Sequence, residues 1–236
     1  MVNSFINQLI KLSNPQKALE KAYFFKTKKG QYGEGDQFIG LTNGQIQELS
    51  KKFKDELSLN DLNKLMKDPI HEIRFAALTV MVLKYKKVKN ENYKCEIVDL
   101  FLENVEYINN WDLVDCSSYF ILGPYFLSKI DKKILFDLAK SGHLWSERIA
   151  IVSTLHFIRN NHFQTTFEIS DILLTNENDL IHKAMGWMLR EIWKKGGNEA
   201  VEKYIKKNIK AIARTTLRYA IEKMPEVKRK EFLKLR

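Results

Sequence analysis

The chain has few cysteines, prolines and glycines, and it has no long apolar run. Its 236 residues include two cysteines, Cys95 and Cys116, which are far apart and outside any Cys-x-x-Cys pair. That usage excludes a disulfide scaffold and a zinc finger and is typical of a reducing compartment. The densest apolar stretch, residues 75–83, has about half the length of a membrane crossing, and the start lacks the pattern of a secretory signal. We therefore expect a cytoplasmic protein with no membrane partner.

Positive charge is abundant and concentrated at one end. The formal net charge is +10. Residues 190–236 hold 15 lysines and arginines against 6 glutamates, a net of +9, whereas residues 1–189 hold 24 basic and 23 acidic side chains. A basic end on a nearly neutral body indicates a polyanionic partner, with nucleic acid ahead of anionic lipid. A solvated, lysine-rich surface is the alternative that charge alone leaves open.

Apolar residues recur at helical spacing almost throughout, and only 10 glycines and 4 prolines interrupt them. No alternating strand pair flanks an Asn-Gly turn, and Asn43-Gly44 opens a helical run instead. Residues typical of helix starts precede or open the helical runs: Asn14-Pro15, Ser58, Asp68-Pro69, Asn90, Asn110, Asp131, Ser146 and Asn178. The sequence predicts an all-α protein with one domain, residues 1–236.

A loose repeat runs along these helices. Basic residues at positions 74, 148, 183 and 218 each come early in an apolar helix, with gaps of 35 residues or about twice that value. Trp111 occupies the skipped position. A period near 36 residues predicts a solenoid of HEAT-like helix pairs, in which equivalent helices line one concave face.

Motifs for metal, phosphate or nucleophilic chemistry are missing. The glycine-rich segment 28–36 has no following Gly-Lys-Ser/Thr and no preceding strand, which favours a turn between helices over a phosphate loop. His71-Glu72 is followed by Phe75 where a zincin motif needs a second histidine. Neither cysteine has a local partner that would activate it. We expect no metal and no cofactor.

Trp111 and Asp115 lie four residues apart and share a helix face if Asn109 or Asn110 caps that helix. Asp112 would lie in the first turn, where the helix dipole favours a carboxylate. Asp115, one turn deeper beside an indole, is harder to explain structurally. A partly buried tryptophan with a solvated aspartate is the alternative for this pair.

Arg148 would place a cation in the first turn of its helix if Ser146 is the cap, and the helix dipole disfavours that position. Lys183 and Arg74 would likewise place a cation early in their helices, where the helix dipole disfavours it. A bound phosphate would resolve the conflict, and so would pairing with Glu147 or Glu72. Trp187, by residue type alone, is a core residue.

At these positions the sequence resembles the bacterial DNA alkylation repair family, whose best-known members are AlkD-type glycosylases. The resemblance covers nearly the whole chain and is carried by several segments in order: residues 32–36, 71–74, 110–115, 144–151, 183–191 and 215–220. It implies a HEAT-like solenoid that binds duplex DNA without pulling the damaged base into a pocket, unlike base-flipping glycosylases. We expect a monomer with no obligate protein partner.

The resemblance also implies roles for individual residues. Asp115 matches the catalytic carboxylate, Trp111 and Trp187 match the aromatic residues that pack against the damaged nucleotide's deoxyribose, and Arg148 matches the arginine that grips a nearby phosphate. Further DNA contacts are expected from Lys183, Arg74, Arg190, Arg214, Arg218, Tyr23 and Phe24. The implied activity is hydrolysis of the N-glycosidic bond of 7-methylguanine and 3-methyladenine. A catalytically silent module for damaged or branched DNA, and a protein scaffold, are the competing hypotheses.

Overall fold

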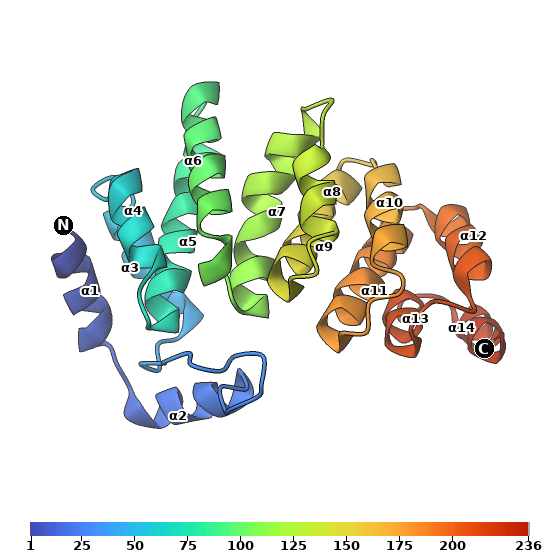
Figure 1. Ribbon diagram of the computed structural model, residues 1–236, viewed down its shortest axis with the longest axis horizontal. Helices are drawn as coiled ribbons and strands as arrows, with labels where there is room; N and C mark the ends of the chain where they lie inside the picture. Colours follow the sequence, from blue (N-terminus) through green and yellow to red (C-terminus); the bar gives the residue numbers. More distant parts are fainter. Residues whose placement is uncertain (236) are drawn as a thin grey trace. The chain divides into compact units, whose positions relative to one another are not determined.

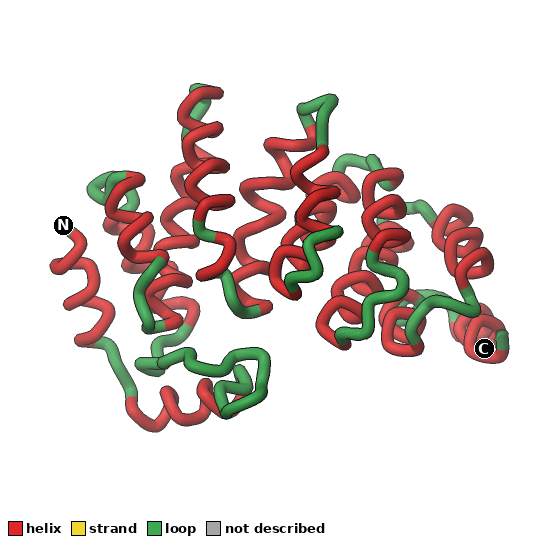
Figure 2. Tube along the Cα trace, viewed as in Figure 1, coloured by secondary structure: helices red, strands yellow, loops and turns green. Residues whose placement is uncertain are grey.

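The computed structural model describes residues 1–235, and its ordered elements are helical apart from one isolated bridge between Gln37 and Ile70 (Figure 2). The helices are α1 (Val2–Lys11), α2 (Pro15–Phe24), α3 (Asn43–Phe53), α4 (Leu59–Met66), α5 (His71–Lys87), α6 (Glu91–Glu103), the 3-10 helix η1 (Val105–Tyr107), α7 (Trp111–Leu127), α8 (Lys133–Ala139), α9 (Leu144–Arg159), α10 (Gln164–Ile172), α11 (Asp179–Lys194), α12 (Asn198–Asn208), α13 (Arg214–Ala220) and α14 (Glu226–Lys234). The all-α prediction is confirmed. No helix within residues 1–235 combines the length and the apolarity that a bilayer crossing requires.

Several helix starts are those that the sequence predicts. The side chains of Asn14, Ser58, Asn90 and Asn178 each accept a hydrogen bond from the backbone of the first turn that follows. Other starts differ by a few residues. The cap of α5 is Ile70 rather than Asp68, that of α8 is Lys132 rather than Asp131, and that of α9 is His143 rather than Ser146.

The chain separates into two compact units, Met1–Ile121 and Leu122–Arg236, with the boundary inside α7. In unit 1, α3 and α4 pack against α5, α1 packs against α3, and α6 packs against α4 and α5 (Figure 1). The first eight residues of α5 are all buried. By contrast, α2 buries none of its residues, and the loop 25–42 follows it (Figure 1).

In unit 2, α9 packs against α8, α10 and α11, and α11 packs in turn against α12 and α13. The crossing of α11 and α13 is close at Gly186, where a Cβ atom would lie 2.7 Å from the carbonyl oxygen of Thr216. Only glycine fits there without moving one of the helices.

The repeat that the sequence suggests has a structural counterpart. Arg148, Lys183 and Arg218 are each the fifth residue of their helix, in α9, α11 and α13 respectively. Arg74 is the fourth residue of α5, and Trp111 is the first residue of α7. The equivalent positions therefore differ by at most one residue in helical register, except at Trp111.

Candidate active site

A buried network of charged groups in unit 1 connects the loop 25–42, α5 and the start of α7. The Nδ1 atom of His71 lies 3.0 Å from Asp36 Oδ2, and its Nε2 atom lies 2.9 Å from Asp112 Oδ2. The side chain of His71 is 1% exposed. Because both ring nitrogens face carboxylates, both must donate, and the ring is a cation.

The pKa of His71 is shifted accordingly. Burial opposes its charge, but the hydrogen bonds and negative charges of Asp112 and Asp36 outweigh burial and raise the pKa above its usual value. Burial likewise acts to raise the pKa of Asp36, yet the His71 hydrogen bond and the positive charge of Arg74 lower it overall. Both shifts favour the ionised form of the group.

Arg74, which the sequence suggests as a DNA contact, belongs to the same buried network. It is 3% exposed, and its Nη2 atom donates to Asp36 Oδ1 at 2.6 Å and to Asn109 Oδ1 at 2.8 Å. Its Nε and Nη1 atoms donate to the carbonyl oxygens of Tyr107 and Asp68. A guanidinium covered by protein acceptors in this way is not presented to a phosphate. Arg74 instead ties Asp36 to the segment that leads into α7.

Glu72, the neighbour of His71, holds the other end of the same loop. It is fully buried, and its carboxylate accepts hydrogen bonds from the backbone N–H groups of Ile39, Gly40 and Leu41. Lys21 of α2 lies 3.5 Å from the same carboxylate. The alternative that Arg74 pairs with Glu72 is not what the structure shows, because the two side chains bond to different partners. The glycine-rich segment is thus a turn between helices, as predicted, but it is also fixed in place by α5.

Aromatic rings complete the cluster. Phe25 stacks on Trp111, with ring centroids 5.3 Å apart, and on Phe38 at 5.2 Å. His71 lies 5.1 Å from Phe25 and 4.6 Å from Phe38. Gly33 allows this packing, because a Cβ atom there would collide with the carbonyl oxygen of Phe25.

Trp111 is partly exposed, and the exposed Phe24 of α2 meets it edge-on at 5.9 Å. Tyr23, beside Phe24, is 70% exposed. The structure therefore places Phe24, one of the expected DNA contacts, against Trp111. Asp115 follows Trp111 by one helical turn and is also partly exposed.

Cys116 follows Asp115 directly in α7. Burial raises the pKa of the adjacent Cys116 thiol well above its ordinary value, and the negative charges of Asp112 and Asp115 raise it further. The thiol therefore stays protonated and is a poor nucleophile. Within residues 1–235, no cluster of three or more histidine, cysteine or acidic side chains is suited to hold a metal ion.

Arg148 in unit 2 does not occupy the position that the sequence suggests. Because α9 begins at Leu144, Arg148 lies in the second turn, where the dipole argument no longer applies. It is 5% exposed, and its Nη1 atom donates to the carbonyl oxygen of Leu180 at the start of α11. Glu147 accepts a hydrogen bond from Asn176. This bond links α9 to the start of α11, and the phosphate contact that the resemblance implies for Arg148 stays a prediction.

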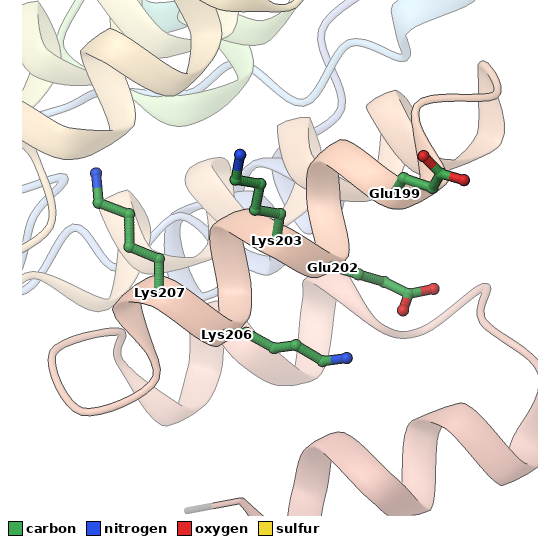
Figure 3. Close-up of a pocket in the computed structure, with 5 residues that line it drawn as sticks. All are labelled: Glu199, Glu202, Lys203, Lys206 and Lys207. Carbon is green, nitrogen blue, oxygen red and sulfur yellow. The ribbon is translucent and has the colours of Figure 1, made fainter.

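The other expected contacts of unit 2 lie on α11 and α13. Lys183 is half-exposed and forms an ion pair with Asp179 at 2.7 Å. Arg190 pairs with Glu222, and Trp187 is partly exposed. Arg214 and Arg218 on α13 are exposed. Lys203 and Lys207 extend from the same side of α12 and line a shallow surface depression (Figure 3), so they add to the positive surface of this unit.

Comparisons with known proteins assign the chain to a family. The sequence matches the family described as DNA alkylation repair enzyme over residues 5–224, so the chain belongs to that family. A solved structure described as a predicted DNA alkylation repair enzyme from Enterococcus faecalis is similar, with a TM-score of 0.68 and 18% sequence identity. The match covers 91% of this chain and 97% of that one, and at this identity it shows the fold alone. No curated protein matches the sequence.

Proposed function

We propose that this protein is a DNA glycosylase that hydrolyses the N-glycosidic bond of cationic alkylpurines, such as 7-methylguanine and 3-methyladenine, in duplex DNA. Membership of the DNA alkylation repair family supports a repair role. The observation that carries the finer proposal is the pairing of Trp111 and Asp115, one turn apart and both partly exposed. The first turn of their helix is held by the buried Phe25 and His71.

The chemistry needs little more than these two side chains. A purine alkylated at N7 or N3 is already positively charged and leaves as a neutral base, so no general acid is required. Bond cleavage leaves an oxocarbenium-like sugar, whose charge a carboxylate such as Asp115 stabilises while it orients the attacking water. The electron-rich face of Trp111 favours the same cationic sugar. Asp115 is the proposed catalytic residue, and Trp111 is its proposed aromatic partner.

DNA binding is proposed to use exposed groups of both units. In unit 1 these are Tyr23 and Phe24 of α2, which are 70% and 60% exposed. In unit 2 they are the exposed cations Arg214 and Arg218 and the partly exposed Lys183 and Arg190, together with the partly exposed Trp187 as a second aromatic contact to the DNA sugar. Such cations neutralise phosphates and hold the duplex without reading its sequence.

The test uses two duplexes of one sequence, one with a single 7-methylguanine and the other with a single O6-methylguanine, which is uncharged. We expect the wild-type protein to release free 7-methylguanine and leave an abasic site, and to leave the uncharged lesion intact. Release of both bases would contradict the cationic leaving-group argument. Tight binding of the 7-methylguanine duplex without release would favour the silent DNA-binding module instead.

A further inference from the structure

His71 connects three segments of unit 1 but takes no direct part in the proposed chemistry. It begins α5, and its ring nitrogens join Asp36 of the loop 25–42 to Asp112 of α7. Asp112 is the second residue of α7, so the bond from His71 fixes the first turn of the helix that carries Asp115. The imidazole is too deeply buried to contact DNA.

The same ring also reaches Trp111 through an aromatic contact. His71 packs on Phe25, and Phe25 stacks on the indole at an interplanar angle of 29°. His71 therefore restrains the two proposed reactive side chains by separate routes. The indole is held through Phe25, and the carboxylate is held through Asp112 and the first helical turn.

We propose that His71 is a positioning residue for base excision, which holds Trp111 and Asp115 in the arrangement that the reaction requires. This role rests on the proposed glycosylase function. A displacement of about 1 Å at a reacting centre can lower a rate by roughly a hundredfold. A buried link that fixes the start of α7 thus affects the rate without touching the substrate.

The charges around His71 are balanced. Asp36 faces it from the loop and Asp112 from α7, while Arg74, on its own helix, compensates the second negative charge through Asp36. The other rings packed against it, Phe25 and Phe38, are neutral. Loss of the proton from His71 would remove one of its two donors and break the hydrogen bond from the ring to one of the two carboxylates. The raised pKa of His71 favours retention of this proton.

Two substitutions separate the two donors of His71. In His71→Gln the amide nitrogen reaches about as far as Nε2 and retains the donor to Asp112, whereas in His71→Asn it reaches only as far as Nδ1 and retains the donor to Asp36. Glu72→Gln is the matched control, because this neighbour is also fully buried but bonds to residues 39–41 and not to α7. All variants are assayed at a temperature at which circular dichroism shows them folded.

The measurement is the single-turnover rate of 7-methylguanine release at saturating enzyme, together with the Kd for the same duplex. We expect His71→Asn to lower the rate by roughly tenfold to a hundredfold with Kd nearly unchanged. His71→Gln should recover most of the rate, and Glu72→Gln should excise at nearly the wild-type rate. The wild-type rate should also fall as the pH rises through the pKa of His71, and His71→Gln should lack that decline.

Each outcome decides a different claim. If His71→Asn releases base at the wild-type rate, or if Glu72→Gln slows release equally, the positioning role is wrong and the proposed function stands. Absence of release by the wild type overturns the proposed function and, with it, this role. Asp112→Asn weakens the same bond between His71 and α7 from the other side. A wild-type release rate in that variant also contradicts the role of His71.

Discussion

The two units of the chain use charge in opposite ways. Unit 1 has 17 lysines and arginines against 16 acidic residues, a net of +1, whereas unit 2 has 22 against 13, a net of +9. In unit 1 the charges of His71, Arg74 and Asp36 are buried and paired with one another. In unit 2 the cations of α13 are exposed.

Buried charge pairs and exposed cations have different physical effects. A buried pair is costly to desolvate and contributes little net stability, but it fixes the geometry of the groups around it. An exposed cation fixes little, yet it attracts a polyanion over a distance that depends on salt. We therefore expect substitutions near the start of α7 to change the reaction rate, and substitutions on α13 to change DNA affinity.

The largest expected effect is that of Asp115→Asn. The neutral side chain keeps the shape but loses the charge that stabilises the cationic sugar, and loss of one such group costs on the order of a hundredfold in rate. DNA affinity should be similar or slightly higher, because a negative charge near the phosphates is removed. Glu103→Gln, an exposed carboxylate on α6, is the control and should keep the wild-type rate. A wild-type rate in Asp115→Asn would contradict its catalytic role.

The second prediction concerns the salt dependence of binding. Each neutralised phosphate contributes about −0.9 to the slope of log affinity against log salt. The double substitution Arg214→Ala with Arg218→Ala should therefore make the slope shallower by about 1.8. The control, Lys51→Ala with Lys52→Ala, removes the same charge from exposed positions on α3 and should leave the slope nearly unchanged. Equal changes in both pairs would mean that binding senses net charge alone.

Arg148→Ala tests whether a buried cation of unit 2 contributes to stability rather than to DNA affinity. The substitution leaves the carbonyl oxygen of Leu180 without its charged donor, and a hydrogen bond from a charged group contributes about 1.5–3 kcal/mol. For a chain of this size each kcal/mol corresponds to roughly 2–4 °C in Tm. We expect a lower Tm and, for the folded protein, nearly normal DNA affinity. Unchanged Tm with weakened binding would restore the phosphate contact that the sequence suggests.

The smallest expected effect is a dependence of stability on pH. Because the pKa of His71 is raised in the folded protein, its contribution is fully present below the unfolded value of 6.5 and is lost as pH rises through the folded pKa. The lowered pKa of Asp36 gives the opposite dependence, with stability lost as pH falls through its folded value. Melting curves should show a decline in Tm above pH 6.5 that His71→Gln lacks.

The helical period predicts most of the fold and part of the site. The spacing of Trp111 and Asp115 places them one turn apart because both belong to one helix. His71 instead bonds to residues 35 and 41 positions away, one of them in a loop without periodicity, so no local pattern indicates the contact. The first-turn position of Arg148 depends on Ser146 as the cap, and this is wrong because His143, an uncommon cap, precedes α9 instead. Local sequence patterns thus predict helices, whereas contacts between residues far apart in the sequence are seen only in the folded structure.

The central claim is that unit 1 determines the reaction rate and unit 2 determines DNA affinity. It is tested most directly by two variants measured side by side on one 7-methylguanine duplex. For Asp115→Asn and for the double variant at Arg214 and Arg218, both the single-turnover release rate at saturating enzyme and Kd are determined. We predict that the first variant loses rate and keeps its affinity, while the second loses affinity and keeps its rate. If both variants change the same quantity, or if Asp115→Asn releases base at the wild-type rate, chemistry and DNA attraction are not divided in this way.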